Sequence, residues 1–223
     1  MMNRLMKSIV LGALVVGALS ASTARADVNV TVNPADPYLG YMNVFELPSN
    51  GGAFQWGSGW GTADLCAVFT GSNLRLSPNT IGDPNPYWYT PSGGPGSTGN
   101  KFMEGNMYVE PAGSLPGQLV TFSGDVISNT LAASHSATVF VKDFAPDFSS
   151  VVTAMIPVPA SGSFSISLNT INDPARHVQY GFQIKGPCVW VTDLGPYGSV
   201  VVGPTQATPA TPATWGRLKA QYK

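Results

Sequence analysis

The sequence predicts an all-β protein, a two-sheet antiparallel β-sandwich in a single domain. Three observations predict it. Only 10% of the 223 residues are charged, whereas 43% are apolar, and there are 25 glycines and 19 prolines. Short runs that alternate apolar and polar residues are separated by glycine, proline, asparagine or aspartate. After the first 26 residues, no window of a dozen residues carries an apolar stripe at helical spacing.

Residues 1–26 have the pattern of a secretory signal peptide, not of a folded element. Arg4 and Lys7 precede an apolar run of 11 residues at 9–19, and Ala24-Arg25-Ala26 matches a small-x-small cleavage site. A run of this length is too short to cross a bilayer, which needs about 20 apolar residues. We therefore expect export to the extracellular space or cell surface, with the periplasm as an alternative, and no transmembrane segment in the mature chain.

The sandwich is expected to occupy residues 27–202. Turn sequences at 48–52, 82–86 and 172–174 and a Gly/Pro/Ser-rich loop at 90–99 interrupt it. Alternation at period two predicts the strands. In chain order they cover 28–32, 41–47, 65–69, 118–127, 137–144, 151–158, 163–168, 178–184, 188–191 and 199–202.

Two further segments follow the sandwich. Residues 203–214, GPTQATPATPAT, are rich in proline, threonine and alanine and are expected to form a semi-rigid spacer. Residues 215–223, WGRLKAQYK, form a short cationic tail that is either frayed or functional.

Charge excludes several classes of function. The chain has a net charge of −1, and removal of the first 26 residues leaves eight cations against twelve acids, a net charge of −4. Disorder driven by charge needs a high net charge and few apolar residues. A nucleic-acid binder needs a basic patch that this composition does not supply, so we expect no nucleic-acid partner.

Two cysteines lie far apart in the sequence, Cys66 and Cys188, each in a predicted strand. In an oxidising compartment such a pair can form a disulfide between strands. Two independent buried thiols that behave as small apolar side chains are the alternative, and the sequence leaves both open.

Catalytic and metal-binding residues give weak patterns. His135 and His177 are not accompanied by a G-x-S-x-G nucleophile motif, so neither is expected to be catalytic. Asp143 and Asp147 flank a proline-containing turn and offer oxygen ligands to structural calcium, but aspartates that organise the turn are the favoured interpretation. We expect no cofactor.

Aromatic residues give the strongest functional pattern. Trp56 and Trp60 stand on the glycine-rich segment WGSGW, and Tyr87 and Trp88 follow Asn85 in a second turn-rich segment. Exposed aromatic faces stack on the apolar faces of sugars, while amides bind the hydroxyl groups. The alternative is that these rings cap the hydrophobic core. Further amides are available at Asn79, Asn100 and Asn106.

Several longer phrases resemble a known kind of module. GTADLCAVFTGSNLRLSPNTIGDPNPYWYTP, GNKFMEGNMYVE, ATVFVKDFAPDFSSV and DPARHVQYGFQIKGPCVWVTD are similar to an uncharacterised β-sandwich module of exported bacterial proteins, some of which carry PEP-CTERM sorting tails. The likeness covers most of residues 61–202 and implies a fold but no activity. More loosely, the chain resembles jelly-roll and galactose-binding-like carbohydrate-binding modules. It lacks the Pro-Glu-Pro motif, membrane span and arginine cluster of sorted members.

These observations predict an exported, non-catalytic binding module for polysaccharide or glycoconjugate. The alternative is a structural cell-surface or extracellular-matrix protein that self-associates, and a hydrolase is the least favoured. A binding module needs aromatic residues exposed together, a self-associating protein needs an apolar patch or an open strand edge, and a hydrolase needs two facing carboxylates.

Overall fold

The computed structural model describes residues 27–205, and these fold into strands and two short 3-10 helices, so the all-β expectation is confirmed. The strands are β1 (Asp27–Thr31), β2 (Leu39–Glu46), β3 (Phe54–Trp60), β4 (Ala67–Thr70), β5 (Asn73–Leu76), β6 (Thr80–Ile81), β7 (Tyr89–Thr90), β8 (Thr98–Gly99), β9 (Lys101–Val109), β10 (Leu119–Asn129), β11 (Ser136–Phe144), β12 (Val151–Pro157), β13 (Gly162–Asn169), β14 (His177–Pro187), β15 (Val189–Trp190) and β16 (Val200–Gly203). The helices are η1 (Pro48–Asn50) and η2 (Gly195–Tyr197).

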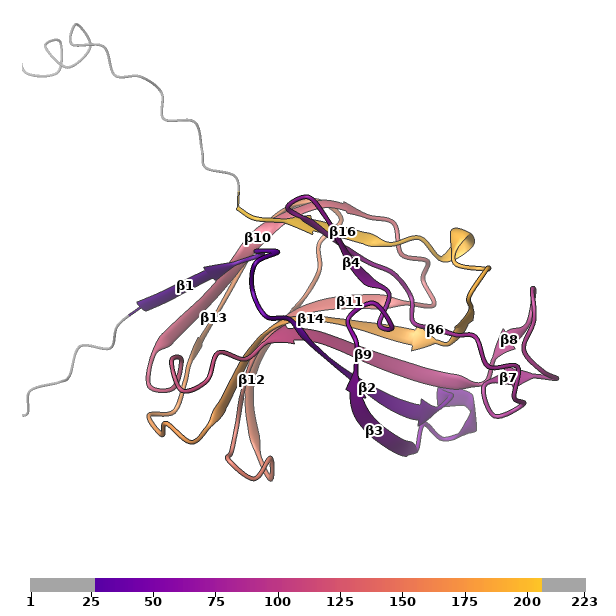
Figure 1. Cartoon of the computed structure of the whole chain (residues 1–223), viewed down its shortest axis with the longest axis horizontal. Helices are drawn as coiled ribbons and strands as arrows, with labels where there is room; N and C mark the ends of the chain where they lie inside the picture. Colours follow the sequence, from indigo (N-terminus) through magenta and orange to yellow (C-terminus); the bar gives the residue numbers. More distant parts are fainter. Residues whose placement is uncertain (1–26, 206–223) are drawn as a thin grey trace, which may run out of the picture.

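Two six-stranded sheets pack against each other (Figure 1). Sheet I has the order β1-β10-β16-β5-β4. In it, β13 pairs along one edge of β10, while β1 and β16 pair with successive parts of the other edge. Sheet II has the order β12-β11-β14-β9-β2-β3 and is antiparallel throughout. The two-sheet sandwich is therefore confirmed.

The sandwich is not antiparallel everywhere. β1 pairs with β10 in parallel, and so does β15 with β6. Three substantial strands were also missed by the prediction: β3, β5 and β9. The segment WGSGW, which lay outside the predicted strands, belongs to β3, an edge strand of sheet II.

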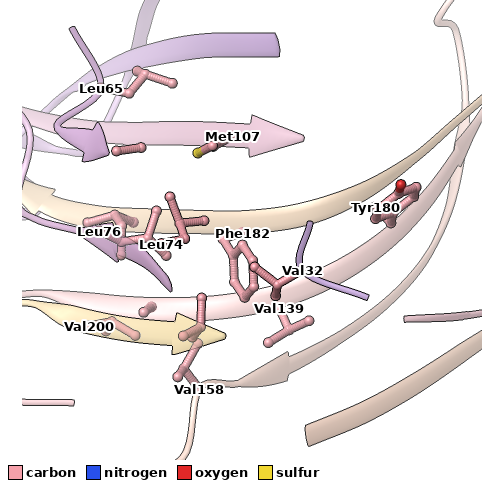
Figure 2. Packing of buried hydrophobic residues seen from close by; sticks show 14 of the residues in the cluster. Val32, Leu65, Leu74, Leu76, Met107, Val139, Val158, Tyr180, Phe182 and Val200 are labelled. Atoms are coloured by element: carbon pink, nitrogen blue, oxygen red, sulfur yellow. The ribbon is translucent and has the colours of Figure 1, made fainter. Parts of the chain in front are cut away.

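The core lies between the sheets and follows the period of two that predicted the strands. Along β10, Val120, Phe122 and Val126 are at most 3% exposed. Figure 2 shows Leu74, Leu76 and Val200 of sheet I lying in the same layer as Met107 and Phe182 of sheet II. Because alternate residues face inward, the intervening residues of each strand form the outer face of its sheet.

The ends of the predicted domain are only partly visible. The predicted signal peptide at 1–26 and the predicted tail at 215–223 lie outside the described residues. The spacer was expected to begin at residue 203, but β16 includes Gly203, and the Thr205 amide donates a hydrogen bond to Thr31 Oγ1 at 3.2 Å. Within residues 27–205, no helix has the length and apolar character needed to cross a membrane.

Candidate functional site

The predicted aromatic residues come together, but on the core side of sheet II. Trp56 pairs with Val44 and Trp60 with Gly40, so both indoles project to the face that carries buried Met42 and Val44. Both rings are half-buried and pack against the core. The alternative interpretation, rings that cap the core, therefore describes much of their environment.

Tyr87 and Trp88 complete this aromatic cluster. The Trp56 ring centroid lies 6.4 Å from that of Trp60 and 6.0 Å from that of Trp88. Trp56 Nε1 donates a hydrogen bond to the Tyr87 hydroxyl at 3.1 Å, and Lys101 Nζ lies 4.3 Å from the Tyr87 ring centroid. These contacts fix the rings against one another, which leaves less of each face for a ligand.

The predicted asparagines do not gather around these rings. Asn85 organises the turn, because its Oδ1 accepts the Tyr87 amide at 2.9 Å. Asn79 is buried and donates to the Ile184 carbonyl, and Asn100 donates to the Pro86 carbonyl at 3.2 Å. Asn106 lies elsewhere, on the outer face of sheet II, in the groove described below.

The two cysteines are free thiols, so the disulfide is not formed in this structure. Cys66 precedes β4 and its Sγ lies 3.3 Å from Thr80 Oγ1. Cys188 is buried between β14 and β15 and donates to the Trp88 carbonyl at 3.0 Å. Burial raises the pKa of the Cys188 thiol. The alternative of two independent thiols is the arrangement found.

Asp143 and Asp147 both have hydrogen-bond partners within the protein. Asp143 is fully buried and its Oδ1 accepts from Arg176 Nε at 2.6 Å. Asp147 accepts from the Ser149 amide at 3.1 Å, as expected for a turn. Among residues 27–205, no cluster of three or more histidine, cysteine, aspartate or glutamate side chains is arranged to hold a metal ion.

The structure reveals a groove that the sequence interpretation did not propose, on the outer face of sheet II. Its volume is about 640 Å³. It crosses β2, β9, β14 and β11, and the turn after β11 contributes one wall. The lining residues are Leu39, Tyr41, Asn43, Asn106, Tyr108, Glu110, Lys142, Phe144, Phe148, His177 and Gln179.

A fixed polar network forms the centre of the groove floor. Asn106 Oδ1 accepts two hydrogen bonds, from Lys142 Nζ at 3.0 Å and from Gln183 Nε2 at 2.8 Å. Asn106 Nδ2 donates to the Glu104 carbonyl at 3.2 Å. Asn106 and Gln183 are both buried, so these bonds hold the amides in one orientation.

A second polar network stands at the end of the groove near the β11–β12 turn. Glu110 Oε1 lies 2.7 Å from His177 Nδ1, and Glu110 Oε2 accepts from Gln179 Nε2 at 2.7 Å. The exposed Phe148 ring stacks on His177, with centroids 4.3 Å apart and an angle of 19° between the planes. This stack places an aromatic ring directly beside a carboxylate and an amide.

Aromatic side chains border both networks. Tyr41 is exposed, and Tyr108 and Phe144 are half-buried beside it. Burial raises the pKa of Tyr108, with a further contribution from Glu110, so its hydroxyl stays protonated at neutral pH. Gly57 of β3 leaves space for the side chains of Asn43 and Tyr41, because a Cβ at this position would lie 2.7 Å from Asn43 Oδ1 and 2.9 Å from the Tyr41 ring.

Lys142 brings a partly buried cation into the groove, and its titration provides a test. Burial lowers the pKa of this amine to about 8, and Lys185 adds to the effect, while Glu104 opposes it. The unfolded chain, with an ordinary pKa of 10.5, binds more protons between these values, so the free energy of unfolding should rise from about pH 8 towards 10. We expect Lys142→Met to remove this rise in urea unfolding curves, because methionine has no amine to titrate. The tyrosine side chains are the same in both proteins, so their contribution to the pH dependence cancels in the comparison. Equal pH dependence in the two proteins would contradict the assignment.

The sequence did contain a signal for this groove. On β9, Met103, Met107 and Val109 face the core, and the residues between them, Asn106 and Tyr108, face outward. Applying the same alternation to β14 assigns Gln179 and Gln183 to the same face. The sequence did not indicate the order of the strands in the sheet, which places β9 beside β14 and so brings these side chains together.

Comparison with protein-family models, with curated proteins and with solved structures found no match to this chain. We therefore infer function from the groove itself.

Proposed function

We propose that this protein is a non-catalytic carbohydrate-binding module and that the outer face of sheet II is its binding surface. One observation carries the proposal: aromatic rings and fixed polar groups share a single open groove. Tyr41, Tyr108 and Phe148 supply ring faces, while Lys142 and Gln179 supply polar groups that hydrogen bonds to Asn106 and Glu110 hold in place.

Sugars need both kinds of group at once. One face of a pyranose carries mostly C–H groups and packs on aromatic rings, while its hydroxyls donate and accept hydrogen bonds. The groove offers donors at Lys142 and acceptors at Glu110, close to the rings. Preorganised polar groups lose little side-chain entropy on binding, which favours affinity for a flexible ligand.

The carboxylates of this face do not have the spacing of a glycosidase. Glu104 lies on the outer face of β9, and Glu110 directly follows the last residue of this strand. The two are six residues apart, which corresponds to roughly 20 Å at the rise of a strand. Glycosidases place their two carboxylates about 5–9.5 Å apart. Glu104 is also paired with Lys185 at 2.7 Å. This geometry supports binding without hydrolysis.

The proposal predicts that Tyr41→Ala and Phe148→Ala each weaken binding about tenfold, which corresponds to roughly 1.4 kcal/mol. The physical reason is the loss of a stacking face at an exposed position. Binding would be measured by affinity electrophoresis and calorimetry with β-glucan, xylan, glucomannan and amylose. Phe54→Ala is the matched control, because Phe54 is 59% exposed on β3 but outside the groove.

Failure of the wild-type protein to bind any of these polymers would contradict the proposal. The self-associating alternative would then gain support if the protein formed oligomers in sedimentation velocity. β12 offers an edge for such association, since it has no charged residue and exposes Val151, Val152 and Met155.

A further inference from the structure

We propose that the groove is one part of a longer track around the end of the β2–β3 pair, and that its ligand is a linear, neutral polysaccharide. This inference rests on the proposed function and specifies its ligand. The track has three parts: the groove described above, a corner hollow of about 480 Å³ and an end hollow of about 570 Å³.

The three parts adjoin one another, because neighbouring parts share lining residues. Leu39, Tyr41 and Tyr108 line both the groove and the corner hollow. Gly59, Trp60 and Gly61 line both the corner hollow and the end hollow. An extended polymer can therefore stay in contact with protein from the β11–β12 turn to the region beside Trp60.

Glycine keeps the corner of the track open. Gly59 pairs with Tyr41 across β2 and β3, so a side chain at this position would stand on the outer face of the sheet. The nearest atom to a Cβ there would be the Gly40 carbonyl oxygen at 3.9 Å, and the backbone is not left-handed. A larger residue would fit the fold but would occupy the path.

Aromatic rings recur along the whole track. Tyr41 and Tyr108 stand where the groove meets the corner, and Tyr38 and Trp60 line the corner itself. The Trp60 indole is fixed in place, because its Nε1 donates to Ser58 Oγ at 3.0 Å. In the proposed track, Trp60 would serve as the sugar-stacking residue expected from the sequence, at a distance from the groove centre.

The charges along the track favour a neutral polymer. Among residues 27–205, no charged residue lines the corner hollow, and Asp64 is the only one that lines the end hollow. In the groove, Lys142 and Glu110 already have hydrogen-bond partners. A polyanion would be repelled by the carboxylates of Asp64 and Glu110 and attracted only by the amine of Lys142. It therefore has no net electrostatic advantage over a neutral polymer.

The test compares chain lengths in a variant that blocks only the corner. Gly59→Trp should fill the corner hollow, and Gln55→Trp is the matched control, because Gln55 is exposed on the same strand but lines none of these hollows. The probes are the tetrasaccharides and octasaccharides of the cello-, xylo-, manno- and malto- series, measured by calorimetry. Circular dichroism and thermal unfolding would check that both variants fold.

For the series that binds, we expect the wild type and Gln55→Trp to bind the octasaccharide at least tenfold more tightly than the tetrasaccharide. Gly59→Trp should keep the tetrasaccharide affinity and lose this gain. Equal affinities for the two lengths, or an unchanged gain in Gly59→Trp, would overturn the track while leaving the proposed function intact. Tighter binding of polygalacturonate than of every neutral polymer would overturn the neutral ligand. Binding of no saccharide at all would overturn the proposed function together with the track.

Discussion

Asp143→Ala is expected to lower the free energy of unfolding by about 3–5 kcal/mol, the range found when one partner of a buried ion pair is removed. The Asp143 side chain is fully buried and that of Arg176 is 9% exposed, with 2.6 Å between Oδ1 and Nε. Without the carboxylate, the guanidinium would remain buried without its counter-ion. The amide of Ile171, which donates to Asp143 Oδ2 at 2.7 Å, would lose its acceptor as well.

This ion pair also positions one end of the groove. Arg176 immediately precedes His177, and its NH2 group donates to the Asp143 carbonyl at 2.9 Å, which ties the start of β14 to β11. His177 in turn bonds Glu110 and stacks on Phe148. Loss of Asp143 should therefore loosen the wall of the groove before it affects the far end of the sandwich.

Urea unfolding followed by circular dichroism would measure the effect. Asp147→Ala is the control, because Asp147 is exposed and accepts hydrogen bonds from Ser149, two residues further along the same turn, so a change within about 0.5 kcal/mol is expected. The double variant Asp143→Ala/Arg176→Met should recover part of the loss, since it removes the unpaired cation. A loss below about 1 kcal/mol in Asp143→Ala would show that the pair does not anchor β11 to β14.

Long strands in which several consecutive inward positions are apolar were predictable, whereas short strands and strands with an interrupted inward row were missed. β10, β11 and β14 each contain consecutive inward positions with branched or aromatic residues, such as Val120 and Phe122 of β10, and their positions were predicted within a few residues. β9 was missed because Lys101 and Gly105 interrupt its inward row of apolar residues. Gly105 is needed there, since a Cβ would lie 2.5 Å from Asn79 Oδ1.

The candidate site was predictable only where its residues belong to one strand, and not where it combines residues from several strands. Trp56 and Trp60 were predicted to be close together and are, because they lie four residues apart on the same face of one strand. The groove combines Tyr41, Asn106 and His177, which belong to three strands. Their proximity depends on the order β14-β9-β2, and that order is set by long-range pairing that no local pattern in one sequence specifies.

Phe122→Ala should destabilise the protein by about 3–5 kcal/mol, the usual cost of removing a buried phenylalanine ring. Phe122 is fully buried on β10 of sheet I. Its ring centroid lies 5.1 Å from that of Tyr180 and 5.3 Å from that of Phe182, both on β14 of sheet II. A third ring, Phe164 of β13, lies 5.3 Å away, so the cavity would be walled by rings from both sheets that cannot easily close it.

Loss of the Phe122 ring should also affect the groove, because β14 contributes residues both to the core and to the groove. Tyr180 and Phe182 face the core, while Gln179 and Gln183, which alternate with them, hold Glu110 and Asn106 on the other face. Urea unfolding would measure the loss, with Ile127→Ala of the same strand as the control, since Ile127 is 53% exposed. We expect less than about 0.5 kcal/mol for the control. A comparable loss in both variants would mean that β10 is stabilised mainly by its backbone pairing with β13 and β16, and not by the ring cluster that joins the two sheets.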